Sequence, residues 1–557
     1  MCNRLLFILL LLAGLHPSLW SQKLGQSVII PAFKKAKPLP AYTKWDSLRG
    51  FNGPMRNWFD VKHYDLHLRV DPYYKRVSGY NDISFEPRIQ ADSMQIDLHP
   101  ALSVKAVVLD GDTLSYRRVR RAILMGMPED LLPDRMHVLR VVYEGEPPVA
   151  KQPPWQGGFV WEETQDDAAW VGVACQFDGA SVWWPLKDHP TDEPDSVDIH
   201  LEVPLGLKAI SNGRLITNYP GINWEYFHWK ISYPINLYNL TVYVGPYLHF
   251  SEPYPYNDSL GELDFYVLPH HEEQARKQFP KTVGILQFLE KRFGNWPWPR
   301  DGFKMVESPY YGMEHQTAIA YGNNFQDNEW GFDYIILHET AHEWWGNSLS
   351  AADMADLWLH EGFATYSEAL YVEEKMGQEA YLNYLKKQYW GIIGNWERMI
   401  GQKGVHAHYS PDIYPKGAWI LHSLRSVYAN DSLFFDLLKN FATRYRQSLI
   451  STQTFINYVN QHSGKDFGPF FQQYLFNHNA PRLELKIEKE KGKKLLVYRW
   501  KNAIEGFDIP VRIQRTKGKE QSEFTLVPTP YWQRLEIKGG KYEAKMFDYY
   551  MGVKYFE

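Results

Sequence analysis

The chain has 557 residues, of which 44% are hydrophobic and 22% are charged. This is the composition of an ordinary globular protein of several domains, and it excludes a disordered chain or a coiled coil. The formal net charge is −5, so no excess of positive charge is available for binding nucleic acid, and we expect no nucleic-acid partner. The two cysteines, Cys2 and Cys175, are too few for a disulfide framework or a thiolate metal site.

The N-terminus has the pattern of an export signal. Arg4 gives a positive start, Leu5–Leu15 is apolar, and small residues follow up to Ser21. The apolar segment is too short to span a membrane. We therefore expect a signal peptide over residues 1–21, an exported protein that is periplasmic or secreted, and no membrane span in the mature chain. An extended lead-in is predicted for residues 22–56, which are rich in Pro, Lys and Gly.

Alternating apolar and polar residues begin after the lead-in. Tyr64, Leu66, Leu68 and Val70 alternate with polar neighbours, which is the period of a half-buried strand. Short segments of this kind continue to about residue 256, with few apolar periods of helical length between them. We therefore predict an all-β N-terminal domain over residues 57–258.

Helical spacing of apolar residues follows, and strands return near the end of the chain. Ala275 to Leu289 is predicted as one helix that ends at Gly294. The helix-rich domain is predicted over residues 259–480, and residues 481–557 are predicted as a small C-terminal β-sandwich. The fold class is thus a multidomain α+β protein in the order β, helix-rich, β.

One motif points to metal chemistry. His338 and His342 are four residues apart, so they share one face of a helix, which we expect to end near Gly346. Catalytic zinc takes three protein ligands and keeps a position open. Glu361, in a second predicted helix, is the candidate for the third. Glu368 lies two turns further on the same face, where it could bond to a zinc-bound imidazole or form an ordinary salt bridge.

Four segments together resemble the gluzincin aminopeptidases, a family that includes alanyl and leucyl aminopeptidases and leukotriene hydrolases. The segments are HETAHEWWGN at His338–Asn347, WLHEGFATYSE at Trp358–Glu368, PYYGMEH at Pro309–His315 and YPKGA at Tyr414–Ala418. The resemblance covers almost all of the chain after the leader, in matching order. It implies that the helix-rich domain is thermolysin-like, and that this is a short form without the large helical C-terminal domain of many relatives.

The resemblance also implies roles for particular residues. His338, His342 and Glu361 would hold one zinc ion per chain. Glu339 would be the general base for the zinc-activated water. Tyr414 would donate a hydrogen bond to the oxyanion that forms on the scissile carbonyl.

A second group of residues would bind the substrate. Glu314 matches the glutamate that binds the free α-amine, and Gln176 matches an N-domain residue at the same amine. Gly312 and Met313 precede Glu314 in the signature. Tyr311 and His315 depart from the usual residues, so the preferred N-terminal residue of the substrate stays open.

The sequence therefore predicts an exported zinc aminopeptidase that hydrolyses the N-terminal bond of peptides with a free N-terminus. Two alternatives stay open. One is an endopeptidase or dipeptidyl peptidase of the same catalytic class. The other is a catalytically inactive peptide-binding protein, against which the joint presence of Glu339, Tyr414 and the three candidate ligands argues. The oligomeric state is not indicated by the sequence.

Overall fold

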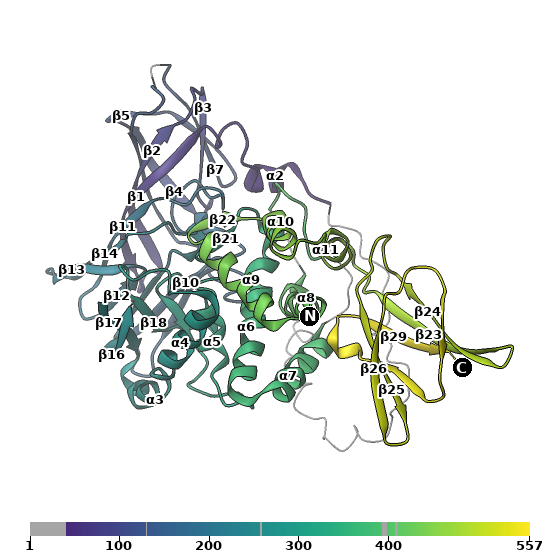
Figure 1. Ribbon diagram of the computed structural model, residues 1–557. Coiled ribbons are helices and arrows are strands. Elements are labelled where there is room, and N and C mark those ends of the chain that lie inside the picture. Colours follow the sequence, from purple (N-terminus) through teal and green to yellow (C-terminus); the bar gives the residue numbers. More distant parts are fainter. Residues whose placement is uncertain (1–40, 130, 257–258, 393–397, 407–409, 557) are drawn as a thin grey trace, which may run out of the picture. The chain divides into compact units, whose positions relative to one another are not determined.

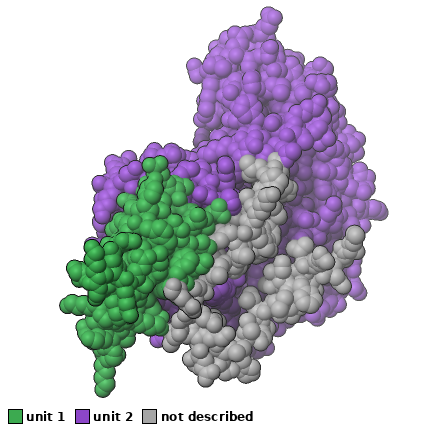
Figure 2. All heavy atoms as spheres, turned by 90° about the vertical axis from the view of Figure 1, so that its right-hand side faces the viewer, with its two compact units in different colours: residues 1–35, 479–557 green, residues 36–478 purple. Residues whose placement is uncertain are grey.

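The computed structural model describes residues 41–129, 131–256, 259–392, 398–406 and 410–556. The chain divides into two compact units, the larger over residues 36–478 and the smaller containing residues 479–557, coloured purple and green in Figure 2. The predicted β domain and the predicted helix-rich domain both lie in the larger unit. The predicted leader and the first part of the lead-in lie outside the described residues.

The described part of the lead-in is not extended throughout. Residues Lys44–Gly50 form helix α2. Its N-terminus carries a capping box, in which the Thr43 hydroxyl oxygen accepts from Trp45 N–H and the Asp46 carboxylate accepts from Thr43 N–H. These bonds satisfy donors that the start of a helix leaves without partners. The prediction of an extended segment overlooked this local signal.

The N-terminal part of the larger unit is built from strands, drawn in purple and blue in Figure 1. In β1 (Phe59–Asp71), the side chains of Tyr64, Leu66 and Leu68 are buried, as the alternation predicts. The largest sheet has eight strands in the order β13 (Arg214–Pro220), β14 (Trp224–Ile231), β11 (Ser196–Pro204), β1 (Phe59–Asp71), β2 (Arg76–Pro87), β8 (His137–Gly145), β4 (Leu102–Leu109) and β5 (Asp112–Thr113). Two smaller sheets have the orders β12 (Lys208–Ser211), β15 (Val242–Gly245), β10 (Ala169–Ala174), β9 (Gly158–Glu163), and β3 (Ser93–Asp97), β7 (Ala122–Gly126), β6 (Tyr116–Val119).

A fourth sheet links this β region to the helices. The sheet order is β16 (Leu248–Tyr256), β17 (Ser259–Val267), β18 (Phe303–Glu307), β20 (Ile319–Tyr321) and β19 (Gly312–Met313). The hydrophobic core of the N-terminal strands continues into this sheet through Val306, Tyr310 and Met313. The strand β19 is at the edge of the sheet, so one side of its backbone is not paired within the sheet.

The helices follow in sequence, drawn in teal and green in Figure 1. The predicted single helix over 275–289 is two helices, α3 (Glu272–Gln278) and α4 (Lys281–Phe293), because Pro280 has no N–H to continue the backbone bonds. Gly294 ends α4, as predicted. The remaining elements are α5 (Tyr334–Ala341), β21 (Leu349–Ala351), α6 (Trp358–Met376), α7 (Gln378–Gly391), α8 (Pro415–Tyr428), α9 (Asp431–Arg444), β22 (Ser448–Ile450), α10 (Thr452–Ser463) and α11 (Gly468–Leu475).

The smaller unit consists of two sheets, which confirms the predicted C-terminal strands and completes the predicted α+β fold class. One sheet has the order β27 (Gln533–Ile537), β24 (Lys493–Lys501), β23 (Arg482–Glu490), β29 (Gly552–Phe556), and the other β26 (Glu520–Leu526), β25 (Val511–Lys517), β28 (Lys541–Ala544). Across the described residues of both units, no helix is both long and apolar enough to cross a membrane.

Candidate active site

Helix α5 places the two motif histidines beside each other. Its N-terminus is capped by the Asp333 carboxylate, which accepts from the backbone N–H of Ile335 at 3.1 Å. Because one helical turn separates them, the Nε2 atoms of His338 and His342 are 3.2 Å apart. Both side chains are almost fully buried. The helix therefore directs two imidazole nitrogens at one point.

The end of α5 differs from the sequence-based expectation. The helix ends at Ala341 rather than near Gly346, and the chain continues in a wide turn in which Asn347 N–H donates to His342 O at 3.0 Å. This turn brings the carbonyl of Trp345 to the ring of His342, whose Nδ1–H donates to it at 2.8 Å. The hydrogen bond on Nδ1 leaves Nε2 as the unprotonated nitrogen that can bind a metal.

The third candidate ligand comes from α6. Glu361 Oε2 lies 3.6 Å from His338 Nε2 and 3.4 Å from His342 Nε2, and it is buried without a hydrogen-bond partner among the described residues. Zinc binds nitrogen and oxygen at about 2.0–2.1 Å, which sets tetrahedral ligand atoms about 3.3 Å apart. The three observed separations match this edge length. The donor set and its unpaired buried oxygen thus fit a zinc ion.

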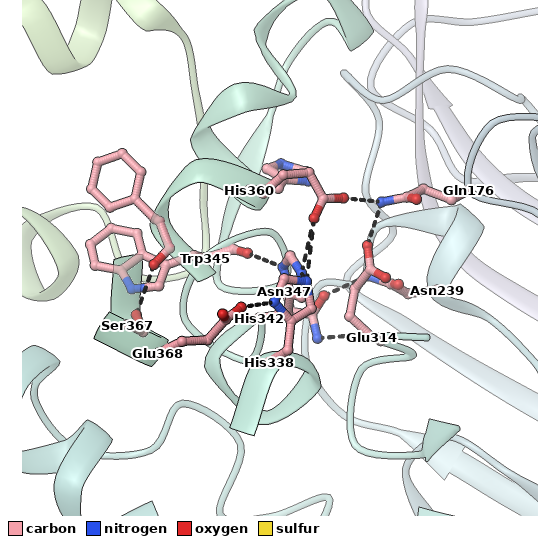
Figure 3. A network of polar contacts seen from close by, with 12 residues as sticks. Gln176, Asn239, Glu314, His338, His342, Trp345, Asn347, His360, Ser367 and Glu368 are labelled. Atoms are coloured by element: carbon pink, nitrogen blue, oxygen red, sulfur yellow. Dashed lines mark hydrogen bonds and ion pairs between the residues drawn. The ribbon is translucent and has the colours of Figure 1, made fainter. Parts of the chain in front are cut away.

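Glu368 supports the first histidine. Its Oε1 accepts from His338 Nδ1–H at 2.7 Å (Figure 3). Its Oε2 accepts from the hydroxyl of Tyr384. The bond to Nδ1 fixes the His338 tautomer with Nε2 facing Glu361. Of the two interpretations open from sequence, a bond to a zinc-bound imidazole or an ordinary salt bridge, this contact with the ring of a candidate ligand favours the first.

Two more carboxylates converge on the same point. Single oxygen atoms of Glu314 and Glu339 and a ring nitrogen of His342 all lie within 4.8 Å of one another. Burial raises the pKa of Glu339 to about 8, and burial also raises the pKa of Glu314. A bound cation would lower both pKa values by favouring the charged carboxylates. The site is built to hold positive charge.

The contacts of Glu314 show how it is held (Figure 3). Its Oε1 accepts from Gln176 Nε2 at 2.6 Å and from the Tyr238 hydroxyl at 2.9 Å. Its backbone carbonyl accepts from Asn347 Nδ2 at 2.9 Å. No hydrogen bond from the described part of the chain reaches its Oε2. Gln176 Nε2 also donates to Glu361 Oε1 at 3.0 Å, so this side chain orients both carboxylates.

Gly312 and Met313, the two residues of β19, have different surroundings. A Cβ atom on Gly312 would be 2.7 Å from Glu339 Oε1, so only glycine lets β19 approach this carboxylate so closely. The Met313 side chain is buried in the hydrophobic core, and only its backbone lies along the sheet edge. The pair therefore offers backbone rather than side chains to the site.

Tyr414 precedes helix α8 and lies against the ligands. Its ring stacks with the ring of His338, with centroids 6.1 Å apart and planes 20° apart. A close crossing of α6 and α8 sets this position. A Cβ on Gly417 would be 2.6 Å from the Cα of Gly362, the residue after Glu361. Tyr414 and Glu361 are thus held in register by two glycines in contact.

His360, which precedes Glu361, and the two departures from the family signature, His315 and Tyr311, have defined places. His360 Nε2 accepts from Ala351 N–H at 2.8 Å, so it is occupied away from the ligands, and burial lowers its pKa to about 3. His315 is fully buried with its Nδ1 2.7 Å from the hydroxyl of Tyr243. Tyr311 is 43% exposed and stacks on Tyr334, whose ring in turn stacks on His338.

Sequence reasoning missed several residues of this network. Trp345 and Asn347 lie inside the motif segment, but the sequence predicts no bond from either of them to a site residue, because these bonds depend on the wide turn after α5. Tyr238 and Tyr384 had no signal in the sequence, since each is one of 37 tyrosines and contacts a residue far along the chain.

Comparison with known proteins agrees with this geometry. Residues 278–474 match the Peptidase family M1 domain. The chain is 27% identical over 282 residues to aminopeptidase N of Streptomyces lividans, in an alignment that covers 48% of this chain and 31% of the relative. It is 20% identical over 419 residues to leukotriene A-4 hydrolase of Xenopus laevis, covering 71% of this chain and 67% of the relative. The chain thus spans about a third of the length of the aminopeptidase N relative.

Solved structures agree on the fold. An M1 zinc metallopeptidase from Deinococcus radiodurans superposes with a TM-score of 0.65 at 22% identity, covering 78% of this chain and 97% of that one. One structure of that protein has a bound Tyr-Ser-Ala substrate. Residues 278–474 thus match the Peptidase family M1 domain, and the geometry of the candidate metal site and the shared fold agree with the resemblance to the gluzincin aminopeptidases.

Proposed function

We propose that the protein is a zinc aminopeptidase that hydrolyses the first peptide bond of peptides with a free N-terminus. The observation that carries this proposal is the buried carboxylate of Glu314, held beside Glu339 and His342 with its Oε2 not bonded within the described residues. A buried anion needs a cationic partner, and the ammonium group of a peptide N-terminus is a cation of suitable size.

One zinc ion per chain would be held by His338, His342 and Glu361. When bound, zinc polarises a carbonyl oxygen and lowers the pKa of a water molecule to about 7. The bonds that His338 and His342 make through Nδ1 keep both rings in the orientation that ligation requires.

Glu339 would act as the general base. It is adjacent in sequence to one ligand, and its carboxylate lies within 4.8 Å of His342 but is not part of the three-ligand cluster. It can take a proton from the attacking water and return it to the leaving amine. Its buried surroundings keep bulk water from competing for that proton.

Glu314 and Gln176 would bind the α-amine. Glu314 Oε2 would pair with the ammonium, while Gln176 Nε2 holds Oε1 in place. The oxygen of the Gln176 amide also receives no hydrogen bond from described residues and can accept one from the same ammonium. The unpaired side of β19 can bind an extended peptide backbone. The tripeptide Tyr-Ser-Ala bound to the Deinococcus radiodurans neighbour supports a peptide substrate.

Tyr414 would stabilise the transition state. Its ring stacks with that of His338, a candidate metal ligand, which supports a role beside the cluster. A hydroxyl donor there can bond to the negative charge that develops on the carbonyl oxygen, and one such donor is worth about 3–4 kcal/mol.

Export is part of the proposal and rests on residues 1–21, whose charge and apolar segment fit a signal peptide. Expression in a bacterial host and N-terminal sequencing of the processed protein test it. Recovery of uncleaved chain from the cytoplasm would contradict export without affecting the proposed chemistry.

Metal analysis and peptide hydrolysis together test the proposed activity. The purified protein should contain about one zinc per chain. It should release the first residue from free peptides, and it should leave N-acetylated peptides intact. Glu339→Gln should keep its zinc while kcat falls by about 10²–10⁴-fold, because the proton acceptor is lost. Full activity of metal-free protein would contradict the proposal, and equal cleavage of acetylated peptides would favour the endopeptidase alternative.

A further inference from the structure

A cleft lined by Tyr414 also has three basic side chains in its walls. It has a volume of about 790 Å³, which is in the usual range for ligand sites. We name it the cationic cleft for Arg49 of α2, Arg121 of the β6–β7 turn and Lys151, which line it. These three residues come from separate segments, so only the fold brings them together.

The two guanidinium groups converge on one acceptor. Arg49 Nη2 and Arg121 Nη1 both donate to the backbone carbonyl of Asp178, the latter at 2.5 Å. Arg121 has one carboxylate within 4.0 Å, Asp178 Oδ1 at 3.9 Å, and Arg49 has none among the described residues. Two cations that share a neutral oxygen repel each other, so an anion placed between them would be stabilised.

The two acidic residues that line the cleft, Asp46 and Asp178, already accept hydrogen bonds from neighbouring groups. Asp178 Oδ2 accepts from Gly157 N–H at 2.6 Å, and Asp46 Oδ2 accepts from the N–H and hydroxyl of Thr43, both at 2.7 Å. His99 also lines the cleft, and its pKa is lowered to about 4, first by burial and then by the charges of Arg121, Arg118 and Arg49.

The rest of the wall suits a peptide. Trp155 and Val149 line the cleft and are 43% and 59% exposed, so apolar surface lies beside the cations. A peptide residue with an apolar side chain and a carboxylate could use both surfaces. Aromatic surface next to positive charge is common where ligands carry both apolar and anionic groups.

The position of Tyr414 relates the cleft to the reaction. In the proposed function, the first residue is held by Glu314 and the scissile carbonyl lies at Tyr414, so the leaving part of the peptide continues past Tyr414. We propose that Arg49, Arg121 and Lys151 bind a carboxylate on this leaving part and favour substrates that carry one. The inference rests on the proposed function. The carboxylate is either the C-terminus of a di- or tripeptide or an acidic side chain near the cleaved bond.

Matched peptides test the inference in the full-length zinc enzyme. The ratio of kcat/KM for a tripeptide with a free C-terminus to kcat/KM for the same tripeptide amide measures recognition of the terminal carboxylate. The corresponding ratio for amidated peptides with Asp or Asn after the first residue measures recognition of a side chain. In the wild type at least one ratio should be about tenfold or more, the size of a charge-assisted hydrogen bond. Arg121→Gln and Arg49→Gln should each lower that ratio about tenfold.

Two controls keep the test decisive. Arg117→Gln removes an exposed charge from the same hairpin but outside the cleft, so it should leave the ratio at the wild-type value. Lys151→Gln changes an exposed side chain, so it gives a readout even if an arginine variant fails to fold. Binding of the paired peptides to Glu339→Gln, measured by calorimetry, should show the same preference without turnover.

The outcomes separate the two proposals. An aminoacyl fluorogenic amide has no carboxylate and reports aminopeptidase activity by itself. If the wild type hydrolyses that amide but shows neither carboxylate preference, the cationic cleft inference is overturned and the proposed function stands. If the amide and all peptides are left intact by the zinc-loaded protein, both are overturned. A preference that Arg117→Gln removes as fully as Arg121→Gln would also overturn the role of the cleft, since it would reflect overall charge.

Discussion

Some residues around the candidate metal site carry a buried charge, and others are small enough to let a charged side chain fit beside them. Glu314 belongs to the first group, since its carboxylate is buried and held by Gln176 and Tyr238. Gly312 belongs to the second, since a side chain there would meet Glu339. Each can be tested by a small change that leaves the other in place.

Glu314→Gln removes the charge of the proposed amine-binding residue and keeps its shape. We expect kcat/KM for free-amine peptides to fall by about 30-fold to several thousandfold, corresponding to the ~2–5 kcal/mol lost when one partner of a buried charge pair is removed. N-acetylated peptides, which the wild type should leave intact, should stay uncleaved in the same assay, so the ratio between the two kinds of substrate shrinks. Retention of full activity on free amines would mean that the ammonium is bound elsewhere.

Gly312→Ala places a methyl group 2.7 Å from Glu339 Oε1. The methyl group would also lie 2.9 Å from Cδ1 and 3.0 Å from Cγ2 of the buried Ile335, so Ile335 and Glu339 must both shift. We expect a Tm lowered by this overpacking, an unchanged zinc content and a kcat lowered by about 10²-fold, since displacement of the proposed general base by about 1 Å has this effect. Thermal unfolding, metal analysis and kinetics check the three parts. Loss of zinc would show instead that the strand itself had moved.

At the scale of elements, the crossing of α6 and α8 aligns two parts of the site. Glu361 is on α6 and Tyr414 precedes α8, and these helices meet where Gly362 and Gly417 are in contact. The contact joins backbone to backbone, so neither side can yield by rotating a side chain. The distance between a metal ligand and the proposed oxyanion donor therefore depends on two residues without side chains.

Gly417→Ala should separate the helices. The new Cβ would lie 2.6 Å from the Cα of Gly362, and such overpacking costs about 1–3 kcal/mol. We expect a lower Tm and a kcat that falls more than KM rises, because Tyr414 moves away from the ligands. Gly284→Ala in α4 is the matched control. Its Cβ meets nothing within 4 Å, so the same substitution should stabilise the protein by about 0.5–1 kcal/mol.

At the scale of the whole molecule, one buried core spans the N-terminal strands and the catalytic sheet, and it contains ionisable groups. His315 is fully buried, and burial lowers its pKa to about 3 from an unfolded value near 6.5. Between these values the unfolded chain binds a proton that the folded chain does not. The free energy of unfolding should therefore fall as the pH drops below about 6.5.

His315→Gln should reduce this acid sensitivity. We expect the slope of the unfolding free energy against pH to flatten by up to about 1.4 kcal/mol per pH unit between about pH 6 and pH 4. Urea-induced unfolding of both proteins at several pH values measures the slopes. The comparison is made on the difference between the two proteins, since protonation of the zinc ligands affects both alike. Parallel slopes would mean that His315 is protonated in the folded protein.

The sequence by itself determined the fold class and the candidate zinc ligands. Alternation in β1 and the spacing of His338 and His342 are local, because strand and helix periods are set within a few residues. It placed the ends of elements less well. Helix α2, the break at Pro280 and the wide turn after α5 depend on particular caps and backbone bonds rather than on period.

Only the tertiary structure decided which residues from distant parts of the sequence contact one another in the site. Gln176 and Glu314 are 138 residues apart, and Gln176 and Glu361 are 185 apart, yet one amide bonds to both carboxylates. The cationic cleft likewise joins Arg49, Arg121 and Tyr414. No period or motif links such positions, because their contacts exist only after the sheets and helices have packed around a common core.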